Sequence, residues 1–269
     1  MVLNKNIVGV LSIQFNPKLS DKNHNLKIIE DYIKENISKT IDIVVLPEFF
    51  STGIDYKSFK EAPDDENSET IVKLRQIARK YKINIVAGTV ITKVNDNYYN
   101  TSFAIDRSGK ILNKYNKIHL YSYFGGTENK RITQGNDYVV VNFDCAKVGL
   151  CICFDFRYPL QFKKLTQMGA EIIVVPTFWL VKNQSLNFEK DKWISLNKIR
   201  AYDNMIYIVS SNTCGQVNND MTSIGNSCIV SPLGNILQNA EDEQCAIYES
   251  IDIDIITEYK KLYPIANID

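Results

Sequence analysis

Four short apolar runs have the length and the β-branched content of buried β-strands. They cover residues 7–15, 41–47, 83–91 and 171–179. Between the first three runs, apolar residues recur at every third or fourth position, which is the spacing of a helix with one buried face. These residues are Leu26, Ile29, Ile33 and Ile37 in the first interval and Ile71, Leu74, Ile77 and Tyr81 in the second. The alternation of strands and helices predicts parallel strands connected by crossover helices.

The middle of the chain has a different pattern, in which extended segments follow one another with short turns between them. The extended segments cover residues 97–109, 110–120 and 138–154, and the turns lie at 107–109 and 144–147. This pattern predicts antiparallel hairpins. We therefore expect strands of mixed orientation in an α/β protein.

A helix followed by strands is predicted again in the last third of the chain. The helix face is marked by four apolar residues, Leu186, Trp193, Leu196 and Ile199. A strand is predicted at 205–212. The segments 223–237 and 246–253 have strand character around the turn residues 232–235, so we expect a final hairpin before a short helix. Glycine and proline are few and dispersed, so no linker is evident and we expect one domain over residues 1–269.

The composition excludes several classes of protein. Hydrophobic residues make up 45% of the chain and charged residues 23%, which suits a globular protein with a buried core. The 31 Lys and Arg residues balance the 31 Asp and Glu residues without a basic stripe, so we expect no nucleic-acid partner. No apolar run approaches the ~18 residues of a membrane helix, so we expect no membrane partner.

The six cysteines are scattered through hydrophobic segments, which does not suggest a disulfide scaffold. Only Cys151 and Cys153 are closely spaced, and a structural zinc site would need a second such pair. We therefore expect no metal site and a reducing, cytoplasmic location.

Three reactive side chains stand where apolar strands end or face inward. Glu48 follows the buried run 43–47, and open α/β sheets bind ligands at the carboxyl ends of their strands. Lys117 alternates with apolar neighbours, and a lysine on an inward face can stabilise a developing oxyanion. Cys153 ends an apolar strand and is followed at once by helix-starting residues, as in a nucleophile elbow.

Two groups could activate Cys153 as a nucleophile. His119, on the same face as Lys117, is the candidate for a Cys–His pair. Alternatively, Glu48 in a partly desolvated cleft could take the thiol proton while the Lys117 ammonium favours the thiolate. Cys151 lies two residues earlier inside the strand and is expected to be core.

Three motifs in order resemble the nitrilase superfamily of carbon-nitrogen hydrolases. They are LPEFF (46–50), NKIHL (116–120) and GLCICFDFRYP (149–159), and the segments 195–212 and 223–237 also resemble later parts of the family. The resemblance implies a four-layer αββα sandwich with two mixed sheets.

The resemblance also implies roles for individual residues. Glu48 would be the general base, Lys117 the oxyanion stabiliser and Cys153 the nucleophile. Glu128, which precedes Gly135 as in the family's glutamate-to-glycine stretch, would orient the lysine and the substrate. The backbone amide of Phe154 would assist at the oxyanion, and Trp179 is a candidate for the pocket wall.

The residues after Cys153 resemble amidases more than nitrilases, and the whole chain is most similar to omega-amidase-like members. We therefore expect hydrolysis of a small ω-amide of a dicarboxylate, similar to 2-oxoglutaramate, through a cysteine thioester and without a cofactor. The alternatives are an N-carbamoyl-amine hydrolase on the same fold and a binding or scaffold protein without catalysis. The resemblance also implies a homodimer or a higher homo-oligomer. The apolar residues of the C-terminal segment are candidates either for its interface or for packing on their own domain, namely Ile255, Ile256, Leu262, Tyr263 and Ile265.

Overall fold

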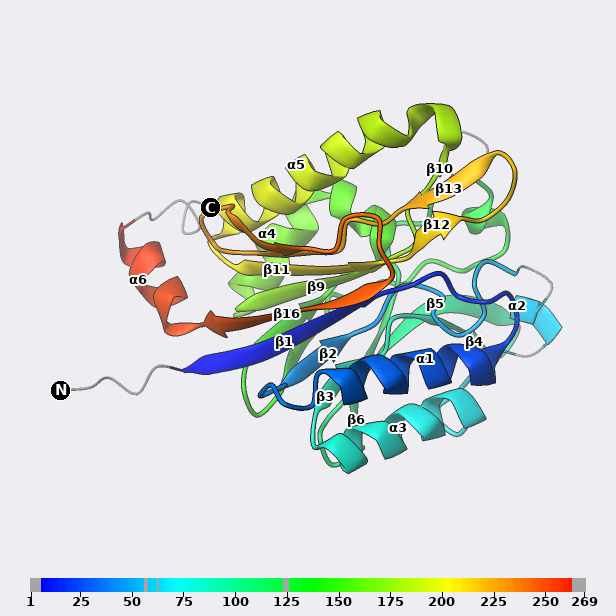
Figure 1. Cartoon of the computed structure of the whole chain (residues 1–269), viewed down its shortest axis with the longest axis horizontal. Helices are drawn as coiled ribbons and strands as arrows, with labels where there is room; N and C mark the ends of the chain where they lie inside the picture. Colours follow the sequence, from blue (N-terminus) through cyan, green and yellow to red (C-terminus); the bar gives the residue numbers. More distant parts are fainter. Residues whose placement is uncertain (1–5, 56–57, 62, 123–125, 263–269) are drawn as a thin grey trace.

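Two β-sheets lie face to face at the centre of the protein and are covered by helices on both outer sides (Figure 1). The structure is a computed structural model and describes residues 6–55, 58–61, 63–122 and 126–262. The two central sheets have seven and six strands, and a third sheet of three short strands lies beside them. This arrangement confirms the predicted αββα sandwich with mixed sheets.

The first sheet has the strand order β16-β1-β2-β3-β5-β4, with β6 paired to β5. Its strands are β1 (Ile7–Gln14), β2 (Ile43–Val45), β3 (Asn84–Val86), β4 (Val90–Val94), β5 (Asn97–Ile105), β6 (Ile111–Asn116) and β16 (Cys245–Asp252). Strands β1, β2 and β3 are parallel, and the other pairs are antiparallel. The parallel strands all point toward one end of the sandwich, where β2 leads into Glu48.

The second sheet has the order β15-β14-β11-β9-β8-β7. Its strands are β7 (Val140–Asn142), β8 (Lys147–Leu150), β9 (Ile172–Thr177), β11 (Tyr207–Asn212), β14 (Cys228–Val230) and β15 (Ile236–Asn239). Here β8, β9 and β11 are parallel. The third sheet joins β10 (Leu180–Lys182), β13 (Met221–Ile224) and β12 (Cys214–Gln216).

Period-two alternation assigns each strand residue to one side of its sheet. Val8 and Val10 of β1 face the second sheet, whereas Leu11 and Ile13 face the helices. The helices α1 (Lys22–Glu35) and α3 (Glu69–Tyr81) cover the first sheet, and α4 (Pro159–Gln167) and α5 (Leu186–Asn204) cover the second. The short helices are α2 (Ser58–Glu61) and α6 (Asp254–Leu262). Each of the three interfaces between layers is therefore a separate apolar core.

Four sequence predictions need correction. Ile37 does not belong to the first helix face, because it lies beyond the end of α1 and is 56% exposed. The run 83–91 is two strands, because the chain turns at Gly88 with φ 44°, and a Cβ there would lie 2.1 Å from the carbonyl oxygen of Pro47. The final hairpin is formed by β14 and β15 around the predicted turn, whereas the segment 246–253 does not join it, since β16 crosses to the first sheet and pairs with β1. On α5, Ile199 does not share the buried face, because 47% of it is exposed.

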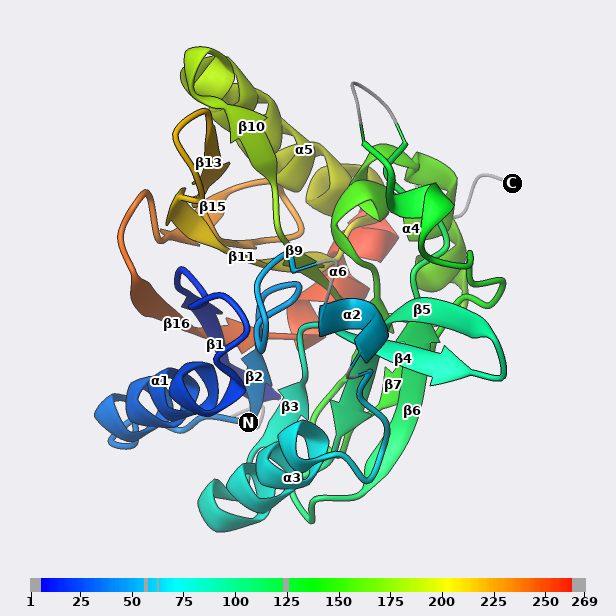
Figure 2. The ribbon, with the colours of Figure 1, turned by 90° about the vertical axis from the view of Figure 1, so that its right-hand side faces the viewer.

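The apolar C-terminal residues that the structure describes do not form one surface. Ile256 is buried in the core between the sheets and Ile255 packs against it, whereas Leu262 is 70% exposed. Tyr263 and Ile265 lie outside the described residues. Figure 2 views the sandwich along its length, with α2 near the viewer and α6 at the far end.

Candidate active site

Glu48 lies directly after β2, where the chain leaves the first sheet and meets the second. Its backbone N–H donates to the carbonyl oxygen of Thr177 in β9 at 3.3 Å. The next residue, Phe49, has φ 53°, and its N–H donates to Oγ1 of Thr89 at 3.0 Å. The turn after β2 is therefore held by both sheets, and it aims a carboxylate between them.

Lys117 follows β6 and is fixed through its backbone on both sides. Its N–H donates to the carbonyl oxygen of Asn100 at 2.9 Å, and its own carbonyl accepts from the N–H of Gly135 at 2.9 Å. A Cβ at Gly135 would lie 2.1 Å from the carbonyl oxygen of Asn116, so this close approach requires glycine. Gly135, which the sequence analysis links to Glu128 by its spacing, thus holds the backbone of the segment that carries Lys117.

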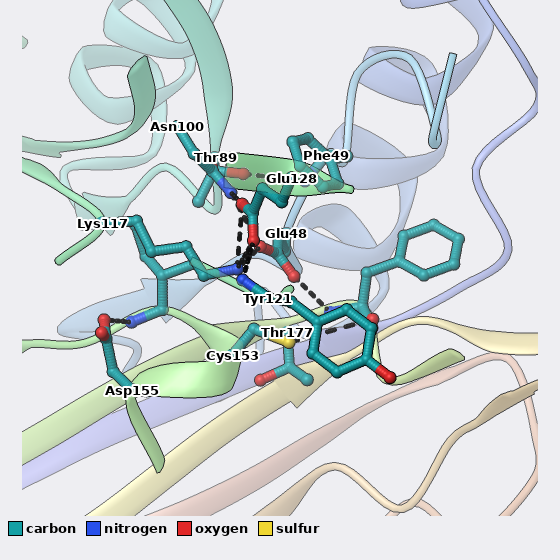
Figure 3. Close-up of polar contacts among 12 residues, drawn as sticks. Glu48, Phe49, Thr89, Asn100, Lys117, Tyr121, Glu128, Cys153, Asp155 and Thr177 are labelled. Atoms are coloured by element: carbon teal, nitrogen blue, oxygen red, sulfur yellow. Dashed lines mark hydrogen bonds and ion pairs between the residues drawn. The ribbon is translucent and has the colours of Figure 1, made fainter. Parts of the chain in front are cut away.

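The side chains of Glu48, Lys117 and Glu128 meet in a buried ion cluster (Figure 3). Lys117 Nζ lies 3.0 Å from Glu48 Oε1, and 3.1 and 2.9 Å from Glu128 Oε1 and Oε2. The lysine and Glu48 are each only 2% exposed. Burial of three charged groups is tolerated only with close pairing and further hydrogen bonds.

Backbone and amide donors complete the cluster. Asn100 Nδ2 donates to Glu48 Oε1 at 2.8 Å and to Glu128 Oε1 at 3.1 Å. The backbone N–H of Phe178 donates to Glu48 Oε2 at 2.8 Å, and that of Tyr121 donates to Glu128 Oε2 at 2.7 Å. Every carboxylate oxygen in the cluster therefore accepts at least one hydrogen bond.

The cluster shifts the pKa values of its members. Burial would lower the pKa of the Lys117 ammonium, but the negative charges of Glu128 and Glu48 outweigh it and raise this pKa well above its ordinary value. For Glu48, burial is the largest effect and raises the pKa of the carboxyl group, with Glu128 acting in the same direction and Lys117 opposing. Lys117 is thus a permanent cation, and Glu48 is a stronger base than an exposed glutamate.

Cys153 begins a 3-10 turn, Cys153–Arg157, immediately after β8 and before α4. Its φ of 45° is the left-handed conformation that places a side chain at the apex of a sharp turn. The thiol faces the ion cluster in Figure 3 and lies 3.9 Å from the carbonyl oxygen of Phe178. Burial and the charge of Glu48 raise its pKa, whereas Lys117 lowers it, so the resting group is a thiol beside a base.

The imidazole of His119 contacts Asp155 and Tyr158 instead of the Cys153 thiol. Its Nδ1 lies 2.8 Å from Asp155 Oδ1, and its ring stacks on Tyr158 with centroids 3.4 Å apart. Asp155, which is fully buried, also accepts hydrogen bonds from the Tyr115 hydroxyl at 2.7 Å and the Ile152 N–H at 2.8 Å. Asp155 therefore connects the lysine segment to the turn of the cysteine, and sequence reasoning did not identify it.

Cys151 is fully buried, as expected of a core residue.

Aromatic side chains and one cation surround the cysteine turn. Phe154 is 6% exposed, and Tyr121 packs edge-on against it with ring centroids 5.3 Å apart. Trp179 is 7% exposed and packs against Trp193. The Arg157 guanidinium lies 5.6 and 5.1 Å from the ring centres of Phe154 and Trp179. Arg157 was not predicted, although it lies within the cysteine motif.

The described part of the chain offers neither a metal-binding cluster nor a membrane-spanning helix. No group of three or more His, Cys, Asp or Glu side chains in it could hold a metal ion. Likewise, none of the helices within the described ranges is both long enough and apolar enough to cross a membrane.

Replacing Lys117 with methionine should destabilise the fold by about 3–5 kcal/mol at neutral pH, because it leaves two buried carboxylates without their cation. Glu48, whose carboxyl pKa burial already raises, would then bind its proton more tightly still in the folded state than in the unfolded state. The loss should therefore shrink as the pH falls and this carboxyl group becomes protonated. Urea unfolding at several pH values measures this.

Lys114→Met on β6 is the matched control, since that lysine is 47% exposed and pairs with the exposed Glu66. It should change the free energy of unfolding by less than about 1 kcal/mol. Equal losses in the two variants, or a Lys117→Met loss that grows at low pH, would contradict the electrostatic account of the cluster.

Comparisons with known proteins agree with this fold and these motifs. The sequence model of the carbon-nitrogen hydrolase family matches residues 10–261. The 2-oxoglutaramate amidase of Bacillus subtilis is 29% identical over 253 residues, which are 94% of each chain. The human omega-amidase is 26% identical over 251 residues, covering 91% of this chain and 89% of that protein.

Solved structures show the same fold. A Saccharomyces cerevisiae member of the nitrilase superfamily matches with a TM-score of 0.85 at 25% identity, covering 98% of this chain and 96% of that one. The carbon-nitrogen hydrolase of Helicobacter pylori G27 has a TM-score of 0.89 at 19% identity, over 98% and 95% of the two chains. The family match spans most of the sequence and includes all three motifs. This chain therefore belongs to the carbon-nitrogen hydrolase family, as a hydrolase of carbon-nitrogen bonds other than peptide bonds.

Proposed function

We propose that the protein hydrolyses a small carboxamide, an ω-amide of a dicarboxylate such as 2-oxoglutaramate, to the acid and ammonia. The observation that carries this proposal is the buried contact of Lys117 with Glu48 and Glu128 next to the thiol of Cys153. The names of the relatives support the substrate class, since they include a 2-oxoglutaramate amidase and omega-amidases.

In the first half-reaction, Cys153 Sγ forms a bond to the amide carbon while its proton passes to Glu48. The negative charge that develops on the amide oxygen is stabilised by Lys117 and by the backbone N–H of Phe154. The carbon–nitrogen bond then breaks, Glu48 returns the proton to the nitrogen, and ammonia leaves. The acyl group remains as a thioester on Cys153.

In the second half-reaction, water takes the place of ammonia. Glu48 accepts a proton from the water as its oxygen attacks the thioester carbon. The carbon–sulfur bond breaks, the proton passes to the sulfur, and the acid is released with Cys153 again a thiol. Both carboxylate oxygens of Glu128 contact Nζ of Lys117 during the two half-reactions. Glu128 therefore keeps the ammonium in place when Glu48 is protonated.

The rim residues support a substrate that carries an acidic group. The side chain of Arg157 is 41% exposed and lies beside Phe154 and Trp179. Its guanidinium is 3.8 Å from the carboxylate of Glu189, which pairs more closely with Lys192, at 2.7 Å. A weakly paired guanidinium at the rim suits a substrate carboxylate. We infer that Phe154 and Trp179 form apolar walls for the carbon chain between the amide and that carboxylate.

A screen with ammonia detection tests the proposal. ω-Amides of dicarboxylates, neutral amides, N-carbamoyl amines and nitriles are supplied to the wild type, with the folded Cys153→Ala variant as the blank. We expect ammonia from ω-amides only with Cys153 present, and the variant to lose at least ~10³-fold in kcat/KM. Carbon dioxide released with ammonia would favour the N-carbamoyl hydrolase, and substantial turnover by Cys153→Ala would exclude this cysteine as the nucleophile.

The pH dependence of kcat/KM should report the ionisation of Glu48. Burial raises the pKa of this carboxyl group above its ordinary value of 4.5, and only the ionised form can accept the thiol proton. Activity should therefore fall as the pH is lowered through the raised pKa, where an exposed glutamate would still be ionised. An acidic limb at or below the ordinary carboxyl pKa would argue against Glu48 as the base.

We also propose that the protein acts in the cytoplasm as a homodimer or a higher homo-oligomer. Six unpaired cysteines suit a reducing compartment. Exposed apolar residues on and beside α5, including Phe188 at 64% and Ile199 at 47%, offer surface for association. Sedimentation velocity at micromolar concentration should give the mass of at least two chains, and a single monomeric species would contradict the assembly.

A further inference from the structure

Asn100 touches all three charged members of the ion cluster. It lies within β5, and none of its surface is exposed. Its backbone carbonyl accepts from the N–H of Lys117 at 2.9 Å, and its side-chain Nδ2 donates to Glu48 at 2.8 Å and to Glu128 at 3.1 Å. One residue thus fixes the position of the lysine segment and joins the two carboxylates (Figure 3).

We propose that Asn100 is a positioning residue that keeps Glu48 ionised and so sets the pH above which Cys153 becomes reactive. This inference rests on the proposed roles of Cys153 and Glu48. In this inference a neutral amide stabilises a cluster in which two carboxylates face one ammonium.

The charges of the cluster explain why a neutral donor is needed. Two carboxylates face one ammonium, which leaves an excess negative charge in a buried place, and neighbouring carboxylates in such places tend to hold a shared proton. A second cation would neutralise the excess but would make Glu48 a weaker base. An amide with two N–H groups favours the ionised form of each carboxylate and adds no charge.

The orientation of the Asn100 amide supports this role. Its Oδ1 is buried and has no hydrogen-bond partner among the described residues. A buried acceptor without a partner costs about 1–3 kcal/mol. With the amide reversed, Oδ1 would face two carboxylate oxygens and no proton would lie between them. The hydrogen bonds to the two carboxylates therefore determine the orientation of the Asn100 amide, and its Oδ1 is left without a partner among the described residues.

The titratable groups around Asn100 come from four segments of the chain. Glu48 follows β2, Lys117 follows β6, Glu128 begins a 3-10 turn, and Cys153 faces the same cluster from the second sheet. Burial and Glu128 raise the pKa of Glu48, and the Asn100 hydrogen bond acts with Lys117 to lower it. Removing the amide should therefore leave Glu48 protonated to a higher pH.

Alkylation of Cys153 by iodoacetamide, followed by mass spectrometry of the Cys153 peptide across the pH range, tests the inference without a substrate. In the wild type the rate should rise with pH as Glu48 loses its proton. In Asn100→Ala this rise should move to higher pH by about one unit, because the hydrogen bonds that favour the ionised glutamate are lost. In Asn100→Asp a third carboxylate replaces the two donors, so the rise should move further in the same direction.

Asn197→Ala is the matched control, because Asn197 is also fully buried, donates to a backbone carbonyl and has an unpartnered Oδ1, but lies on α5. Its alkylation profile should match that of the wild type. Asn100→Ser, which keeps one donor, should give a smaller shift than Asn100→Ala and provides a milder change if the larger ones disturb the fold.

The outcomes separate the inference from the proposed function. Profiles of folded Asn100 variants that overlay the wild-type profile would overturn the inference and leave the function intact. Loss of the fold in every Asn100 variant, with Asn197→Ala folded, would overturn it as well, since Asn100 would then be a determinant of the fold. A wild-type Cys153 whose alkylation does not depend on pH would contradict the proposed function and, with it, the inference.

Discussion

A buried ammonium held between two carboxylates is the interaction on which the rest of this structure depends. Taking Lys117, Glu48 and Glu128 out of water is costly, and their mutual attraction offsets that cost only with close contacts and further donors. Those donors are the amide of Asn100 and the backbone N–H groups of Phe178 and Tyr121. This requirement accounts for the turns that follow the strands, because each turn must place a charged side chain or a backbone N–H group at the ion cluster.

The same requirement connects the two sheets. Glu48 follows a strand of the first sheet, yet its backbone N–H donates to Thr177, the last residue of β9 in the second sheet, and one of its carboxylate oxygens accepts from the N–H of Phe178 just beyond. Asp155 makes a similar connection, because it binds the segment around His119 to the turn of Cys153. The relative position of Glu48, Lys117 and Cys153 is therefore fixed by hydrogen bonds that join the two sheets.

Much of this arrangement could be predicted from the sequence, because buried strands and amphipathic helices have local periodicities. Glu48 and Cys153 stood out as polar residues at the ends of apolar runs. Asn100 and Asp155 did not, because an asparagine within a strand and an aspartate at a turn are common, and only the folded chain shows which charges they face. The pairing of β16 with β1 depends on contacts between distant segments, which no local pattern records.

That pairing has a consequence for biosynthesis. β1 is bonded on one side to β2 and along its whole length to β16, from Ile7 opposite Asp252 to Gln14 opposite Cys245. While the ribosome is still translating the middle of the chain, the outer border of β1 has unsatisfied N–H and C=O groups that could template aggregation with other nascent chains. Chaperone protection of this border would matter most during that interval, and it would become unnecessary once β16 has emerged and docked.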